Sequence, residues 1–423
     1  MPIQKLASLS LAERAAILAR GGAVSSEIKN AVAEILAKIR ADGEPAVLAF
    51  TKKFDGVALA SLAVSQKELD AVDEKSAEFA FLRAAAKNIR QFHLAQLQNI
   101  RAEKKVQTAP GVELSRVWRP IRKVGIYAPG GLATYPSSVL MQAIPARIAG
   151  CREIILATPP RKDGSISDVV IAAAKISGVT KILKVGGAQA IGALAFVEKV
   201  EKITGPGNIF VTEAKTQIAT EIPIDMPAGP SEILILADDS AVPRFIAADL
   251  LSQAEHGPDS TAILITLSQK LAEKVEAELN SQIQKLQRRE LAQKSWQSRG
   301  RILVAQNLNE LIAFANDFAA EHLEICLKNP AKVLPQIQNA GSIFLGNFAS
   351  EPAGDFATGT NHVLPTAGFA RNFNPLSVET FGKKIQVQKI SKSGLAKIRQ
   401  TCEKFGAVEG LGAHARSISI RFE

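Results

Sequence analysis

Histidine, which moves protons near neutral pH and binds metals, occurs only five times in this 423-residue chain. His93 falls in the apolar-faced stretch NIRQFHLAQL, which indicates a structural role. The other four, His256, His322, His362 and His414, lie in the C-terminal half, within expected helix ends or loops. This concentration predicts an active site assembled mainly from the C-terminal half of the chain.

Two of these histidines have polar neighbours at short spacing. Gln253 lies three residues before His256 near the expected end of a helix, so both side chains leave one helix face and can converge on a cation. Glu321 directly precedes His322 at the expected end of another helix, where a carboxylate beside an imidazole could handle a second proton. Each pair also has a plainer interpretation, in which the side chains bond loop backbone or pack without a catalytic role.

Two further polar groups lie closer to the C-terminus. Asp355 and His362 share the segment EPAGDFATGTNHVLPT, which is too rich in Gly, Pro and Thr to predict regular structure. Glu409 lies five residues before His414 in the tail. Taken alone, the aspartate is typical of a turn and the tail residues are typical of a surface.

Composition narrows the possible function. The 51 basic and 41 acidic residues give a formal net charge of +10, but the cations are scattered among acids and few aromatics accompany them, which argues against nucleic-acid binding. A positive surface would instead attract anionic ligands such as dinucleotides. Cys151, Cys326 and Cys402 lack the spacing of a cysteine-based zinc site and fit a reducing compartment. No apolar run reaches membrane-spanning length, so we expect a cytoplasmic protein without a membrane partner.

The pattern of apolar residues predicts the elements that position these groups. The first hundred residues indicate helices, with capping boxes at Ser10–Glu13 and Ser65–Glu68, the second opening a long helix to about residue 97. From about residue 112, strand-like and helix-like runs alternate in two successive series, which predicts two parallel α/β sheets with a ligand crevice beyond the strand ends. The predicted strands are KVGIYA, EIILAT, KILKV, EKIT, EILILAD, AILITLS, RILVAQ and GSIFLG. Between AILITLS and RILVAQ we expect one long helix over about 269–294. The tail after about residue 375 has two weak strands, KKIQVQKI and SISIRF, and is too small to fold alone.

Glycine-rich turns follow two of the predicted strands. Gly125–Gly131 and Gly205–Asn208 both precede a plausible helix start, where backbone amides could receive a phosphate. Neither completes the G-x-G-x-x-G fingerprint, because Phe210 occupies the place of the third glycine in the second turn. Phosphate contact and ordinary strand-to-helix turns both remain open on this pattern.

Several longer strings resemble, in order, the signature blocks of the L-histidinol dehydrogenase family, from about residue 25 to 418. They are VGIYAPGGLATYPSSVLM, GGAQAIGALAF, GPGNIFVTEAK, MPAGPSEILILAD, SQAEHGPDS, AAEHLEI, GDFATGTNHVLPT and EGLGAHARS. The resemblance implies a zinc-dependent enzyme that oxidises L-histidinol to L-histidinaldehyde and then to L-histidine with two NAD, the last two steps of histidine biosynthesis.

The resemblance also assigns residues to roles. It implies zinc ligands at Gln253, His256, Asp355 and His414, open positions of the metal being filled by substrate nitrogens. The implied substrate site comprises these four residues together with Ser231, His322, His362 and Glu409. The implied NAD contacts are Tyr127, Gln189 and Asn208.

The family's chemistry gives Glu321 and His322 separate tasks. His322 would accept the alcohol proton in the first oxidation, and Glu321 would activate water to attack the aldehyde in the second, with His322 again taking a proton. Cys326 raises the alternative of a thiohemiacetal route, although nothing around it in the sequence would activate the thiol. A related NAD-dependent dehydrogenase of another small alcohol is a second alternative.

The implied fold class is α/β, with two incomplete Rossmann-like domains, one inserted in the other, and small terminal arms exchanged in a homodimer. The expected boundaries are an N-terminal helical arm over 1–22 and an outer domain over 23–126 plus 233–375 that carries most of the active site. An inserted NAD-contacting domain would span 127–232. A C-terminal arm over 376–423 would bring Glu409 and His414 to the partner's active site.

Overall fold

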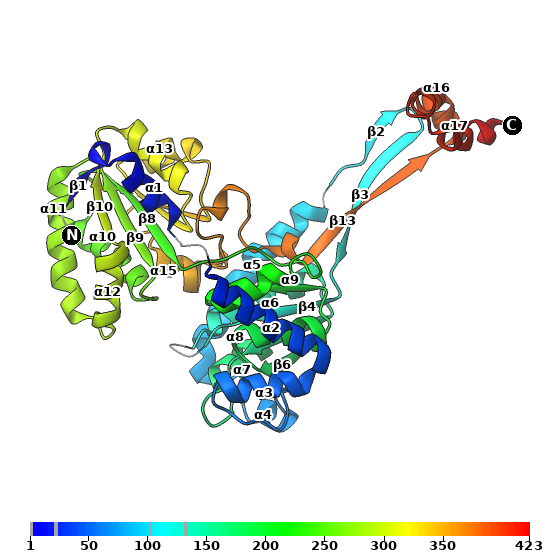
Figure 1. The fold of residues 1–423 in the computed structure, drawn as a ribbon. Coiled ribbons are helices and arrows are strands. Elements are labelled where there is room, and N and C mark those ends of the chain that lie inside the picture. Colours follow the sequence, from blue (N-terminus) through cyan, green and yellow to red (C-terminus); the bar gives the residue numbers. More distant parts are fainter. Residues whose placement is uncertain (1–2, 21–23, 102, 131–133) are drawn as a thin grey trace.

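The computed structural model describes residues 3–20, 24–101, 103–130 and 134–423. Figure 1 shows two α/β units and a long arm that extends from one of them and carries the C-terminus. None of the helices within the described residues combines the length and apolarity needed to cross a membrane. The predicted α/β class with parallel sheets is confirmed.

The large sheet has six parallel strands within the described ranges. The strands in spatial order are β1 (Gln4–Lys5), β10 (Arg301–Val304), β9 (Thr261–Thr266), β8 (Glu232–Ala237), β11 (His322–Cys326) and β12 (Ser342–Leu345). The helices are α1 (Leu11–Ala19), α10 (Pro243–Ala254), α11 (Gln269–Gln282), α12 (Arg289–Arg299) and α13 (Leu308–Phe318). Side chains of the sheet alternate between two cores: Ile233 and Ile235 pack under α10–α12, and Leu234 and Leu236 pack under α1 and α13.

The small sheet has four parallel strands in the described part of the chain, in the order β6 (Lys181–Lys184), β5 (Glu153–Thr158), β4 (Lys123–Tyr127) and β7 (Lys202–Thr204). Both faces are again covered. One face packs against α5 (Ala80–Arg101), α6 (Pro136–Ala149) and α7 (Asp168–Ser177). The other packs against α2 (Ser26–Asp42), α3 (Glu44–Phe54), α8 (Gly187–Gly192) and α9 (Ile209–Ile218).

The N-terminal helices cover a different sheet from the one we expected. The predicted outer domain joined 23–126 to 233–375, but α2, α3 and α5 pack on the small sheet, to which β4 also belongs. The apolar pattern of an amphipathic helix indicates that one of its faces is buried, but it does not indicate which sheet buries that face. The sequence could therefore not predict on which sheet these helices pack. Within the predicted arm over 1–22, β1 pairs with β10 and α1 packs on the large sheet, while residues 1, 2, 21 and 22 lie outside the described residues.

Two predicted helices are shorter than expected. The capping boxes at Ser10–Glu13 and Ser65–Glu68 are confirmed, but the second opens only the short α4 (Gln66–Asp70). Between α4 and α5, Asp73 and Ser76 accept hydrogen bonds from nearby backbone amides, which favours turns over a continuous helix. The long helix predicted over 269–294 is likewise divided into α11 and α12 by a short 3-10 segment over 283–285.

The arm comprises residues 106–120 and 382–422. Its three-stranded antiparallel sheet has the order β13 (Gly382–Ile390), β3 (Val112–Pro120) and β2 (Val106–Ala109), with α16 (Lys392–Val408) and α17 (Gly412–Ser419) at the tip (Figure 1). The predicted strand KKIQVQKI is confirmed. The predicted strand SISIRF is wrong, because this segment is helical: the hydroxyls of Ser417 and Ser419 bond carbonyls three residues earlier.

Candidate active site

His322 is the first residue of β11, at the amino edge of the large sheet, and Glu321 directly precedes it. The prediction that this pair ends a helix is wrong. The helix α13 stops at Phe318 because Ala319 adopts a left-handed conformation with φ of 50°, and the chain then enters the strand. In β11 alternate residues face opposite cores, which directs His322 and Glu324 away from the side packed under α13.

The backbone of Glu232, the first residue of the neighbouring β8, fixes both groups. Its N–H donates to Oε2 of Glu321 at 2.8 Å, and its carbonyl accepts from Nδ1 of His322 at 3.1 Å. Both side chains are buried, and Oε2 of Glu321 lies 3.6 Å from Nδ1 of His322. Because a carbonyl only accepts, this contact places the ring proton on Nδ1 and leaves Nε2 able to accept another proton.

Asp355 lies near Nε2 of His322, and His362 is bonded to Asp355. Oδ1 of Asp355 lies 3.6 Å from Nε2 of His322, and Nδ1 of His362 donates to the backbone carbonyl of Asp355 at 3.0 Å. Asp355 is in a short helical turn over residues 354–358 that follows α15 (Glu351–Ala353), where we had expected no regular structure. The structure therefore brings together three of the predicted site residues, Asp355, His322 and His362.

Glu351 is a member of this site that the sequence analysis missed. One ligand atom each from Glu351, His322 and Asp355 lies within 4.8 Å of the others, an arrangement that could hold a metal ion. The hydroxyl of Ser252 on α10 donates to Oε2 of Glu351 at 3.3 Å, which ties the cluster to the helix that carries Gln253. The only available signal was the four-residue spacing of Glu351 and Asp355, which places both on one helical face.

The enclosed charges shift the pKa values of the cluster. Burial raises the pKa of Glu321 to about 8 and that of Glu351 to about 8. Burial alone would lower the pKa of His322, but the carboxylates of Glu321 and Asp355 outweigh it and raise the pKa to about 10. Burial alone would raise the pKa of Asp355, but His322 and His362 outweigh it and lower the pKa to about 2. The carboxyl groups of Glu321, Glu351 and Asp355 are thus crowded around one imidazole, and a bound cation would favour their ionised forms.

Gln253 lies in the last turn of α10, which Ser252 ties to this cluster, and His256 lies two residues beyond the end of the helix. Gln253 is fully buried, yet neither Oε1 nor Nε2 of its amide has a hydrogen-bond partner among the described residues. His256 donates from Nδ1 to the carbonyl of Ser252 at 3.0 Å, which leaves Nε2 for a ligand. Burial of an amide without hydrogen-bond partners costs folding free energy. These residues therefore suit a bound cation, which the amide oxygen of Gln253 would coordinate.

Two predicted members of the site lie elsewhere in this chain. Glu409 and His414 are exposed near the tip of the arm, beyond the far end of β13 (Figure 1). The arm carries its own exposed apolar side chains, including Phe405 at 61% and Val408 at 74% exposure. A single chain therefore does not bring Glu409 or His414 to the cluster around His322.

The residues expected to contact NAD line a separate pocket of about 770 Å³. Tyr127 is the last residue of β4, and Gln189 and Asn208 follow β6 and β7, so all three lie at the carboxyl edge of the small sheet. The Tyr127 hydroxyl accepts from the N–H of Gly187 at 3.2 Å, and Oδ1 of Asn208 caps α9. The structure places these three residues around one pocket. The glycine-rich turn over 125–131 contributes Gly130 to the lining, and Gly131 lies outside the described residues.

The first turn of α6 contacts the histidine cluster. Ser138 lies in that turn, and its hydroxyl is 3.4 Å from Nε2 of His362. Asn361 donates to the carbonyl of Met141 on the same helix at 2.6 Å. Ser231 immediately precedes β8 at the amino edge of the large sheet, next to Glu232. The two edges therefore face a common region between the units.

Cys326 occupies the opposite end of β11 from His322 and is buried. Burial raises the pKa of its thiol well above the usual range. A thiol in this state does not supply a thiolate at neutral pH, and its position at the carboxyl end of the strand separates it from the cluster. These findings contradict the thiohemiacetal alternative.

The two α/β units have parallel sheets, and they carry a buried cluster of carboxylates and imidazoles and a pocket large enough for a nucleotide. This combination is typical of an α/β enzyme. The sequence model of the family described as histidinol dehydrogenase matches residues 18–422. The histidinol dehydrogenase of Methanosarcina mazei is 46% identical over all of this chain and 98% of its own length. That of Listeria monocytogenes is 46% identical over 94% of each chain. The crystal structure of histidinol dehydrogenase from Elizabethkingia anophelis superposes with a TM-score of 0.92 at 41% identity, over 98% of this chain and 96% of that one. The chain therefore belongs to the histidinol dehydrogenase family of oxidoreductases.

Proposed function

We propose that this protein oxidises L-histidinol to L-histidine through L-histidinaldehyde, using zinc and two NAD, as the last two steps of histidine biosynthesis in the cytoplasm. The observation that carries the proposal is the fully buried amide of Gln253, which has no hydrogen-bond partner among the residues that the structure describes, beside the cluster of His322, Glu351 and Asp355. Family membership over nearly the whole chain supports the substrate and the cofactor.

The metal would be held by Gln253, His256, Asp355 and a fourth ligand, His414, from the partner subunit's arm. Two imidazoles, an amide oxygen and a carboxylate suit zinc with open coordination positions. Zinc, when bound, supplies a Lewis acid that orients substrate nitrogens and alcohol oxygen. Neutralisation of Asp355 by a cation would also reduce the negative field that raises the pKa of His322, which favours the neutral imidazole that a base needs.

In the first oxidation, His322 accepts the substrate hydroxyl proton at Nε2. Its Nδ1 keeps its proton because Glu232 holds it through the backbone carbonyl, so the ring has one defined basic nitrogen. Burial of the ring excludes water that would compete for the same proton. Glu321, whose Oε2 lies 3.6 Å from Nδ1 of His322, stabilises the imidazolium that results.

In the second oxidation, Glu321 activates water for attack on the aldehyde. One carboxylate oxygen, Oε2, is held by the N–H of Glu232, which leaves Oε1 to accept a proton from water. His322 then takes the hydroxyl proton of the resulting hydrate at Nε2. Ser231, His362 and the partner's contribution of Glu409 and His414 would hold the substrate between the two oxidations, which keeps the aldehyde from escaping.

NAD, when bound, supplies the hydride acceptor for each oxidation, and we place it in the pocket lined by Tyr127, Gln189 and Asn208. Arg161 and Lys162 line the same pocket and would favour an anionic ligand. The contact of Ser138 with His362 links the start of α6 to the cluster and would bring the two reactants together.

The homodimer with exchanged arms is part of this proposal. The arm carries α16 and α17 away from the rest of its own chain (Figure 1), and with them Glu409 and His414. Its tip exposes the apolar side chains of Phe405, Val408, Leu411 and Ile420. An arm of this kind would bury those side chains on a second copy and complete that copy's site.

The test follows NADH formation when L-histidinol and NAD are added to the purified protein, with and without a zinc chelator. Two NADH per histidinol, loss of the reaction with chelator and its recovery on adding zinc are expected. No NADH from L-histidinol, together with NADH from another small alcohol, would instead favour a related dehydrogenase of different specificity.

A further inference from the structure

Arg20, at the C-terminal end of α1, places a charged side chain in the interior of the large-sheet unit. Only 8% of the residue is exposed, and its guanidinium stacks 3.8 Å from the ring centroid of Phe318 and donates to the Phe318 carbonyl at 2.5 Å. Arg20 also adopts a left-handed conformation with φ of 42°, which disfavours side chains other than glycine or asparagine. A strained, buried arginine at a helix end indicates that the side chain has a specific partner.

That partner is Glu232. Nη1 of Arg20 lies 2.8 Å from Oε2 of Glu232, and the two side chains are 4% and 2% exposed. Oε2 makes no hydrogen bond with any residue that the structure describes, so the arginine charge is its compensation. The other carboxylate oxygen, Oε1, accepts the N–H of Ala367. The Glu232 side chain is therefore held between the N-terminal segment and the segment that follows His362.

Glu232 connects this ion pair to the chemistry. Its backbone N–H holds Glu321, and its backbone carbonyl holds Nδ1 of His322. A side chain fixed on both oxygens restricts the backbone of the residue that carries it. Displacement of that backbone would move the carboxylate and the imidazole together, because both bonds belong to one residue.

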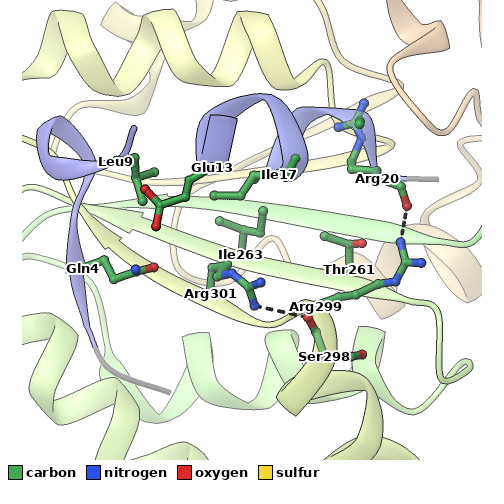
Figure 2. Close-up of a pocket in the computed structure, with 12 residues that line it drawn as sticks. Gln4, Leu9, Glu13, Ile17, Arg20, Thr261, Ile263, Ser298, Arg299 and Arg301 are labelled. Atoms are coloured by element: carbon green, nitrogen blue, oxygen red, sulfur yellow. Dashed lines mark hydrogen bonds between the residues drawn. The ribbon is translucent and has the colours of Figure 1, made fainter. Parts of the chain in front are cut away.

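The backbone of Arg20 is fixed as well. Figure 2 shows Arg299 of α12 reaching the Arg20 carbonyl. Nη2 of Arg299 also lies 3.6 Å from Oδ1 of Asp259, in the loop that follows His256. Arg20 is thus anchored at its main chain and at its side chain.

We propose that Arg20 is a positioning residue for the Glu321–His322 pair, acting through its buried ion pair with Glu232. The inference rests on the function proposed above for these two residues. It assigns to the N-terminal helix a role in turnover, although α1 contributes no group to the cluster itself.

The test is a set of variants assayed with both L-histidinol and L-histidinaldehyde. Arg20→Met keeps the length of the side chain and removes the charge, and we expect kcat for both substrates to fall by about 10- to 100-fold, as for displaced catalytic groups. KM and zinc content should stay near wild type, because Gln253, His256 and Asp355 are held by other elements. Arg20→Lys, which keeps the charge, should recover part of kcat. The double variant Arg20→Met with Glu232→Gln should be more active than the product of the two single effects, since it leaves no unpaired buried charge.

Arg14→Met is the matched control. Arg14 belongs to the same helix, pairs with Asp317 on α13 at 2.8 Å and lies over Phe314, but it does not reach Glu232. The kcat of Arg14→Met should match that of the wild type. Equal kcat values for Arg20→Met, Arg14→Met and wild type would overturn the inference, as would strict multiplicativity in the double variant. If Arg20→Met does not fold, Arg20→Lys and Glu232→Gln decide the matter by the same kcat and KM comparison. Inactivity of wild type towards L-histidinol would instead refute the proposed function.

Discussion

Replacing Gln253 by methionine should make the metal-free protein more stable and the zinc-loaded protein less stable. Gln253 is fully buried in α10, and its amide oxygen and nitrogen have no partner within the described residues. Methionine has a similar length and no amide to desolvate. The substitution therefore removes a cost in the metal-free state and a ligand in the metal-bound state.

The magnitude follows from the buried amide. An unpaired buried polar group costs about 1–3 kcal/mol, so the free energy of unfolding of the metal-free variant should rise by about that amount. For a unit of this size, each kcal/mol of added stability raises Tm by about 2–4 °C. The metal-free variant should therefore melt several degrees above the metal-free wild type. Zinc at a thousand times its Kd should stabilise the wild type by about 4 kcal/mol and the variant far less, which reverses the order.

Thermal unfolding with chelator and with zinc, combined with a measurement of bound zinc, tests this reversal. Gln142 provides a matched control, because it is also fully buried but bonds the Tyr127 and Ser138 carbonyls and the Thr204 hydroxyl. Gln142→Met should destabilise the protein in both conditions by leaving those groups unpaired. A metal-free Gln253→Met that melts below the metal-free wild type, or that retains zinc, would refute the reasoning.

Three further predictions concern catalysis. Glu321→Gln should slow aldehyde oxidation by about 10²- to 10⁴-fold and spare alcohol oxidation, whereas His322→Asn should slow both; equal losses for Glu321→Gln in the two steps would contradict the division of labour. Because burial raises the pKa of Glu321 to about 8 and only the carboxylate acts as a base, aldehyde oxidation should increase as the pH rises through about 8, a step that Glu321→Gln should lack in a pH profile. Mixing inactive His414→Asn and His322→Asn proteins under conditions that exchange subunits should restore activity, since one of the two sites in a mixed dimer would be intact; no recovery, with exchange confirmed by mass, would rule out an active site shared between subunits.

The sequence predicted the α/β class because strand and helix periodicities are local properties. The eight strands from KVGIYA to GSIFLG are all present, and each follows from a short apolar run between turns. Packing partners are not local. The apolar faces of α2 and α5 are evident in the sequence, but their choice of the small sheet depends on contacts with distant segments, α8 and α9 for α2 and α6 and α7 for α5.

The candidate site shows the same contrast between features set by local sequence and features set by distant contacts. Gln253, His256, Asp355 and His362 could be named from their residue types and from the resemblance, and their neighbourhood follows from the structure. The strand position of His322 could not be predicted, because one left-handed residue, Ala319, ends the preceding helix early. Glu351 was missed because its role depends on burial against Ser252.

The two ligand regions lie at opposite edges of their sheets, and helix polarity explains why. At the amino edge of the large sheet, α10 and α13 present their C-terminal ends, whose partial negative charge favours cations. That is the edge where Gln253, His256 and His322 lie. At the carboxyl edge of the small sheet, α6 and α9 present their N-terminal ends, which favour anions such as phosphate. A metal-assisted oxidation by a dinucleotide needs both environments within reach of one substrate, and the contact of Ser138 at the start of α6 with His362 brings these two edges together.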